Sequence, residues 1–275
     1  MDQMDQMGDR PHPTTEKSRQ LDSAELDSVG RDSGDRPSAL ELAQRRLIVA
    51  LDVPSADAAL ALVDRLEGRC TWFKVGLELY VAAGPAIVEK LVARGHSVFL
   101  DLKLQDIPNT VASAVRATAS LGVRMLTIHA SGGPAMLAAA REATAGIAAP
   151  PQLLAVTVLT SMDQAQLTAI GVPRSPQEQV ALLAKMGLET GINGFVCSSQ
   201  EVAALRALTG PAGVLVIPGI RPAGTDRGDQ QRVATPAQAL REGASYLVVG
   251  RPITQAKDPA KATEIILDEI SGALQ

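Results

Sequence analysis

Three charged side chains follow one another at the end of a single apolar segment. Residues 99–110 read Phe-Leu-Asp-Leu-Lys-Leu-Gln-Asp-Ile-Pro-Asn-Thr, a pattern typical of a buried strand running into a helix start. Asp101 and Lys103 are two residues apart, so both point to the same side of an extended strand, and Asp106 follows at its end. Isolated charges there cost several kcal/mol. We expect either acid–base and charge-stabilising chemistry or a buried ion pair that only fixes the strand.

The elements that must position these side chains are short apolar segments separated by helix-like segments. After residue 45 the segments are 47–52, 71–77, 97–103, 123–129, 153–160, 194–198, 214–219 and 246–250. Their near-continuous Val, Ile and Leu content is typical of strands covered on both faces. Ser55, Pro176 and the pair Asp258-Pro259 mark the starts of three intervening helices.

Eight alternating units in about 230 residues predict an α/β fold, a (β/α)8 TIM barrel. A doubly wound open sheet is the alternative, but it would need a glycine-rich turn after its first strand. The first predicted strand instead ends in Leu51-Asp52-Val53-Pro54. The barrel is therefore favoured.

In a TIM barrel the catalytic groups lie at the carboxyl ends of the strands. Polar residues gather at those ends, namely Asp52, Lys74, Glu78, Asp101, Lys103, Asp106, His129, Thr160, Ser161, Arg221 and Arg251. Asp52 and Lys74 suit the hydroxyl groups of a sugar, with a structural ion pair as the alternative. For His129 a supporting role is favoured over substrate contact.

A phosphate site is predicted after the last two strands. Gly219-Ile220-Arg221 follows one and Gly250-Arg251 follows the other. Glycine lets the backbone approach a ligand closely, and arginine adds charge-assisted hydrogen bonds. Loops at these two places often bind phosphate in TIM barrels. The polar segment 221–232 is interpreted as a mobile lid, with an ordinary solvated loop as the alternative.

The first 44 residues differ in composition from the rest of the chain. They hold 10 acidic and 5 basic residues, so the net charge of −4 leaves about +1 for residues 45–275. We predict a disordered acidic tail over 1–44 and one barrel domain over 45–275. The body has no bulk charge that indicates nucleic acid, and no apolar stretch indicates a membrane span. Cys70 and Cys197 lack metal-type spacing, so we expect reduced thiols, no metal and a cytoplasmic location.

Seven motifs over residues 47–267 together resemble the orotidine 5′-phosphate decarboxylase family, in its bacterial type. They are Ala50-Leu51-Asp52, Phe73-Lys74-Val75-Gly76, residues 101–110, Val158-Leu159-Thr160-Ser161, Pro218-Gly219-Ile220-Arg221, Asp229-Gln230-Gln231-Arg232 and Val249-Gly250-Arg251. The resemblance implies conversion of orotidine 5′-monophosphate (OMP) to UMP and CO₂ in pyrimidine biosynthesis, without a cofactor. It also implies a homodimer with shared active sites.

The resemblance also implies residue roles. Lys103 would protonate C6 of the pyrimidine, and Asp101 would lie beside the departing carboxylate. Asp106 and Thr110 would reach into the neighbouring subunit's site. The remaining implied substrate contacts are Asp52 and Lys74 on the ribose, Ile107, Thr160 and Ser161 near the ring or ribose, and Arg221, Gln230, Gly250 and Arg251 on the phosphate.

Two other functions stay open at this point. A magnesium-dependent sugar-phosphate decarboxylase or synthase of the same superfamily shares the Asp-x-Lys-x-x-Asp array, and Glu78 could then bind the metal. The decarboxylation of OMP is favoured over this alternative by Ile107-Pro108-Asn109-Thr110 and by Gln230. A non-catalytic nucleotide-binding barrel is the other alternative, and the retention of all three charged residues of the array argues against it.

Overall fold

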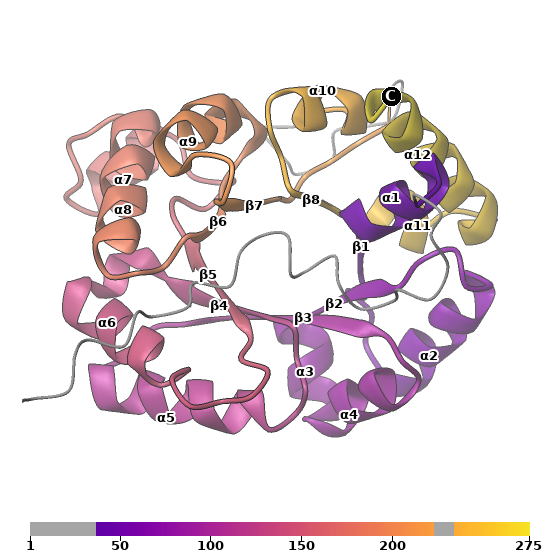
Figure 1. The fold of residues 1–275 in the computed structure, drawn as a ribbon, viewed down its shortest axis with the longest axis horizontal. Coiled ribbons are helices and arrows are strands. Elements are labelled where there is room, and N and C mark those ends of the chain that lie inside the picture. Colours follow the sequence, from indigo (N-terminus) through magenta and orange to yellow (C-terminus); the bar gives the residue numbers. More distant parts are fainter. Residues whose placement is uncertain (1–36, 223–233) are drawn as a thin grey trace, which may run out of the picture. The chain divides into compact units, whose positions relative to one another are not determined.

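The computed structural model describes residues 37–222 and 234–275, in which eight parallel strands close into a barrel in the order β1 to β8 (Figure 1). The strands are β1 (Leu47–Ala50), β2 (Trp72–Gly76), β3 (Ser97–Leu104), β4 (Met125–His129), β5 (Gln152–Val156), β6 (Gly194–Val196), β7 (Val214–Ile217) and β8 (Tyr246–Val249). Each strand overlaps one predicted segment. The predicted TIM barrel is confirmed.

Helices form the outer ring of the barrel (Figure 1). They are α1 (Ala39–Arg46), α2 (Ala56–Arg65), α3 (Leu77–Ala83), α4 (Ala86–Ala93), α5 (Pro108–Ala119), α6 (Pro134–Glu142), α7 (Gln164–Ala169), α8 (Pro176–Glu189), α9 (Val202–Thr209), α10 (Pro236–Arg241), α11 (Arg251–Thr254) and α12 (Pro259–Ala273). Helices α2, α8 and α12 start where Ser55, Pro176 and Asp258-Pro259 predicted, and the side chains of Ser55, Ser175 and Asp258 cap them.

The strands are largely apolar on both faces because the barrel has an inner and an outer core. Ile48, Phe99 and Met125 belong to the inner core, while the neighbouring Val49 and Leu100 pack outward toward the helices. Alternate residues thus fill the barrel and the layer beneath the helices. This arrangement explains why the strand segments read as continuous apolar runs.

Helix α1 begins at Ala39, so the predicted boundary at residue 45 falls inside this helix. Ser38 and Glu41 form a reciprocal capping box at its start, and Ala43 is fully buried. The hydroxyl of Ser271 on α12 donates to the carbonyl of Ala39 at 3.3 Å. Residues 39–44 therefore belong to the folded body, and the disorder predicted for residues before 37 lies outside the described residues.

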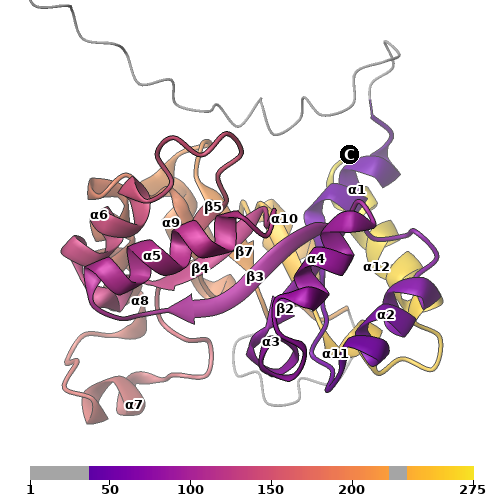
Figure 2. The ribbon, with the colours of Figure 1, turned by 90° about the horizontal axis from the view of Figure 1, so that it is seen from below.

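The short helices α3, α7 and α11 follow β2, β5 and β8 and lie together at one end of the barrel (Figure 2). This is the end where the parallel strands finish and where the polar residues were predicted to meet. Within residues 37–222 and 234–275, no helix is long and apolar enough to cross a membrane. The predicted lid lies almost entirely in residues 223–233, outside the described residues.

Candidate active site

A cavity of about 480 Å³ opens at the carboxyl ends of the strands. Its polar walls are formed by the residues Asp52, Lys74, Glu78, Asp101, Lys103, Thr160, Arg221 and Arg251. Its floor is apolar and is formed by side chains of the barrel strands, including Ala50, Phe99, Val156, Val216 and Val248. The cavity thus combines an apolar floor with charged walls, as ligand pockets commonly do.

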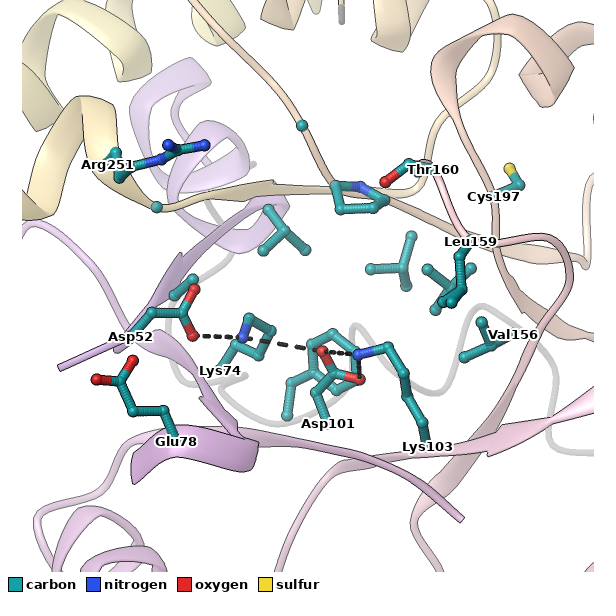
Figure 3. A pocket seen from close by; sticks show the side chains of 18 of the residues that line it. Asp52, Lys74, Glu78, Asp101, Lys103, Val156, Leu159, Thr160, Cys197 and Arg251 are labelled. Atoms are coloured by element: carbon teal, nitrogen blue, oxygen red, sulfur yellow. Dashed lines mark hydrogen bonds and ion pairs between the residues drawn. The ribbon is translucent and has the colours of Figure 1, made fainter. Parts of the chain in front are cut away.

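Four alternating charges form a continuous chain across the cavity wall (Figure 3). Lys74 Nζ lies 2.8 Å from Asp52 Oδ1 and 3.8 Å from Asp101 Oδ2. Lys103 Nζ donates to both carboxylate oxygens of Asp101 at 2.9 Å. The side chains of Lys74 and Asp101 are only 11% and 13% exposed. Pairing offsets much of the cost of burying these charges, which would be severe for a lone ion.

An irregularity in β3 places Lys103 in this chain of charges. Leu100 pairs with Leu126 on β4, and Leu104 pairs with Ile128. The chain therefore advances four residues along β3 while it advances two along β4. Lys103 adopts a φ of +51° within this bulge. A left-handed conformation costs a non-glycine residue about 1–2 kcal/mol. The bulge lets Asp101 and Lys103 point into the same cavity with their charged ends in contact, and such bulges are common next to active sites.

The phosphate side of the predicted site is formed by the turns after β7 and β8. Arg221 is buried, and its backbone is held by a hydrogen bond from its N–H to the carbonyl of Ala234 at 3.0 Å. Gly219 has a φ of +73°, which glycine adopts without strain. Arg251 opens α11 and, with Gly250, lines the cavity opposite Lys103 (Figure 3). The two predicted arginines therefore share one cavity.

Gly76, at the end of β2, leaves space for the ion pair between Lys74 and Asp52. A Cβ at this position would lie 2.8 Å from Lys74 Nζ and 3.1 Å from Asp52 Oδ1. Any side chain here would have to displace the ammonium from its carboxylate. The motif containing Gly76 was noted in the sequence, but this steric role becomes visible only when strands β1 and β2 are placed side by side.

Part of the predicted set does not line the cavity of the single chain. Asp106, Ile107 and Thr110 lie at or just before the start of α5 and are exposed, and Ser161 is also exposed. The Asp106 carboxylate accepts a hydrogen bond from the N–H of Ile107 at 2.6 Å. Gln230 lies outside the described residues.

His129 ends β4 beside the chain of charges. Burial lowers the pKa of its imidazole, and the positive charge of Lys103 lowers it further, while Asp101 opposes both effects. Its Nδ1 is buried and has no hydrogen-bond partner among the described residues. Lowering of its pKa favours the neutral ring, which suits the supporting role expected from the sequence.

Glu78 lines the cavity close to Asp52 (Figure 3). In residues 37–222 and 234–275, no group of three or more His, Cys, Asp or Glu side chains is placed to hold a metal ion. The arrangement instead offers ammonium and guanidinium groups to an anionic ligand.

Thr127 is a polar residue next to Asp101 and Lys103 that sequence reasoning missed. It sits within an apolar strand segment, and its hydroxyl contacts both Asp101 and Lys103. Cys197, considered only as a buried thiol, also lines the cavity. A single hydroxyl inside Met-Leu-Thr-Ile-His gives no signal, because the bulge that brings it to Lys103 cannot be read from the residues.

Comparison with known proteins gives a consistent result. The family model described as orotidine 5′-phosphate decarboxylase / HUMPS family matches residues 45–266. An orotidine 5′-phosphate decarboxylase of Moorella thermoacetica is 55% identical over 234 residues, covering 83% of this chain and 93% of that protein. The corresponding protein of Nitrosococcus oceani is 54% identical over 226 residues, covering 82% and 97%. The crystal structure of the Lactobacillus acidophilus enzyme of that name aligns with a TM-score of 0.72 and 39% identity, covering 82% of this chain and 99% of that one.

Proposed function

Since the chain belongs to the orotidine 5′-phosphate decarboxylase / HUMPS family and is an orotidine 5′-phosphate decarboxylase, we propose the roles that its residues have in converting OMP to UMP and CO₂. The observation that carries these roles is the chain of alternating charges at the cavity wall, which ends in Lys103. The magnesium-dependent alternative is not favoured, because the similar proteins named above are orotidine 5′-phosphate decarboxylases.

Lys103 is the proposed proton donor. Loss of CO₂ leaves a negative charge on C6 of the pyrimidine, and an ammonium next to that carbon stabilises the charge and then protonates it. At about 4 Å and an effective dielectric of about 20, one such charge contributes roughly 4 kcal/mol. Enzymes lower barriers by about 8–23 kcal/mol, so Lys103 supplies only part of the effect.

Asp101 is proposed to hold Lys103 and to lie beside the carboxylate that leaves. The two hydrogen bonds from Lys103 Nζ to Asp101 fix the ammonium on the cavity side of β3. A substrate carboxylate placed next to Asp101 would be repelled, which would favour its departure. Such destabilisation of the bound substrate is a contested source of catalysis, so we assign Asp101 mainly to positioning.

The rest of the rate enhancement is assigned to binding far from the reacting carbon. Asp52 and Lys74 would bind the ribose hydroxyls, and Arg221, Gly250 and Arg251 would bind the phosphate, with Gln230 and Thr160 completing the substrate contacts. Binding energy gained at the phosphate can be used to hold the ring against Lys103. Arg251 lies across the cavity from Lys103, which supports this division (Figure 3).

A homodimer with shared sites is the proposed assembly. Asp106, Ile107 and Thr110 are exposed and do not line the cavity of their own chain, yet they directly follow the catalytic strand. In a symmetric dimer the same segment can complete the partner's site. The exposed Ile107 and Val81, 67% and 81% accessible, are apolar surface that such an interface would cover. Cys70 and Cys197 are both buried and form no disulfide in the described part of the chain, which supports the proposed cytoplasmic location.

A direct test is the ultraviolet absorbance change of OMP with purified protein in EDTA. We expect rapid conversion in the wild type and in Lys90→Ala, which removes an exposed lysine of α4. Lys103→Ala should lose nearly all turnover and still bind UMP. Turnover by Lys103→Ala within tenfold of the wild type would remove Lys103 from its role. Activity that disappears in EDTA and returns with magnesium would instead favour the sugar-phosphate alternative.

A further inference from the structure

Thr127 joins the two charged residues of β3 through a single hydroxyl. Its Oγ1 accepts a hydrogen bond from the backbone N–H of Lys103 at 2.9 Å. The same hydroxyl donates to Asp101 Oδ1 at 3.0 Å. The direction of the second bond is fixed, because an ionised carboxylate can only accept. The hydroxyl is therefore used as acceptor and donor at once, toward two different catalytic-site residues.

The bulge in β3 explains why a hydroxyl is needed at this position. Two extra residues between Leu100 and Leu104 interrupt the pairing with β4, and Lys103 turns into the left-handed region. A buried backbone N–H almost always has a partner in a folded protein. Here the partner of the Lys103 N–H is the side chain of Thr127 rather than a strand carbonyl.

Thr127 does not belong to the surface that a substrate would touch. Its side chain is fully buried in the middle of β4 and is not among the residues that line the cavity. Any effect of Thr127 on the reaction must therefore pass through Asp101 and Lys103.

We propose that Thr127 is a positioning residue for decarboxylation, which holds the Asp101 carboxylate and the left-handed backbone of Lys103 in register. Loss of the hydroxyl leaves the Lys103 N–H without its partner and removes one of the two hydrogen bonds that Asp101 Oδ1 accepts. The ammonium then loses its fixed place next to C6, while the proposed phosphate contacts of Arg221 and Arg251 stay unchanged. This inference rests on the proposed role of Lys103.

The test compares two substitutions that separate the hydroxyl from the shape of the side chain. Thr127→Val keeps the shape and removes the hydroxyl, whereas Thr127→Ser keeps the hydroxyl and removes the methyl. Thr263→Val is the matched control: Thr263 is equally buried on α12, and its hydroxyl donates to the carbonyl of Pro259, far from the cavity. Each purified variant is assayed for kcat, KM and affinity for UMP.

The expected result is a kcat for Thr127→Val at least about tenfold below wild type, the equivalent of 1.4 kcal/mol, with KM and UMP affinity within about threefold. Thr127→Ser and Thr263→Val should keep kcat within about threefold. If Thr127→Val does not fold, Thr127→Ala replaces it, with the same loss expected. The proposal is overturned if the variant without the hydroxyl turns over like the wild type, or if Thr127→Ser loses as much as that variant.

The Lys103→Ala and Thr127→Val variants distinguish a wrong role of Lys103 from a wrong role of Thr127. If Lys103→Ala retains turnover, the proposed role of Lys103 is wrong. If Lys103→Ala is inactive while Thr127→Val has wild-type kcat, only the role of Thr127 is wrong.

Discussion

At the scale of single residues, the ion pairs of the site are closely packed against the backbone of Gly76. Lys74 bridges Asp52 and Asp101, and Gly76 leaves the space in which its ammonium sits. The charges of this group balance before any substrate binds. An anionic substrate therefore meets cations that are already held in place rather than cations that must be ordered on binding.

Gly76→Ala should damage binding more than folding. The added methyl group would lie 2.8 Å from Lys74 Nζ, the mobile end of a flexible side chain, so the chain still folds and the ammonium moves. We expect UMP affinity to fall at least about tenfold, or 1.4 kcal/mol. Gly272→Ala, at a helical position of α12 with open space around its Cβ, is the control and should leave affinity unchanged. Calorimetric titration with UMP measures both, and unchanged affinity in Gly76→Ala would contradict the steric role.

His129 and His96 should make the protein less stable as the pH falls. Burial is the main cause that lowers the pKa of each below the ordinary value of 6.5. The unfolded chain then takes up protons first, so stability is complete above about pH 7.5 and falls as the pH drops through 6.5 toward the lower folded pKa. The free energy of unfolding in urea, measured between pH 8 and 5.5, should show this decline. It should be smaller in His129→Asn, and an unchanged slope in that variant would assign the effect elsewhere.

At the scale of elements, the strands were predictable and the irregularities were not. The eight apolar segments predicted the strands because both of their faces are buried. The predicted segment 153–160 is longer than β5, which ends at Val156 before a turn, because apolar residues continue into the cavity floor as Val158. The bulge in β3 could not be predicted. A glycine usually marks a backbone position with positive φ, and here that position is occupied by Lys103.

Site residues were predictable to the extent that they end strands. Asp52, Lys74, Asp101 and Lys103 share one cavity, as the alternation of strands and helices indicated. Thr127 was missed because its role depends on pairing between β3 and β4. Residues 39–44 of helix α1 were assigned to the tail because they contain no continuous apolar run. The packing of α1 against α12 joins parts of the chain more than 200 residues apart, which the local sequence does not indicate.

Helix α1 should stabilise the barrel without taking part in catalysis. Removing residues 1–36 should leave the melting temperature and kinetics unchanged, since no residue before Ala50 lines the cavity in the described part of the chain. Removing residues 1–46 exposes the surface under Ala43 and deletes the hydrogen bond from Arg46 to the Ser245 carbonyl. We expect a loss of about 2 kcal/mol, which lowers the melting temperature by about 4–8 °C. Equal melting temperatures for both deletions, measured by calorimetry, would show that α1 contributes nothing.

At the scale of the whole molecule, the shared-site dimer makes a quantitative prediction. Lys103→Ala and Asp106→Ala subunits should each be nearly inactive alone. In a mixed dimer, one of the two sites combines an intact Lys103 with an intact Asp106 of the partner subunit. Unfolding and refolding equal amounts together should restore about a quarter of wild-type activity. Each variant refolded alone is the control, and no recovery in the mixture would show that Asp106 serves its own chain.

The contact between α1 and α12 brings the two ends of the folded body together at the end of the barrel opposite the cavity (Figure 2). A short peptide linker could therefore join residue 275 to residue 37, and the chain could be opened at a surface loop instead, giving a circularly permuted enzyme. For the same reason, an affinity tag or a surface anchor at either end would leave the substrate entrance clear.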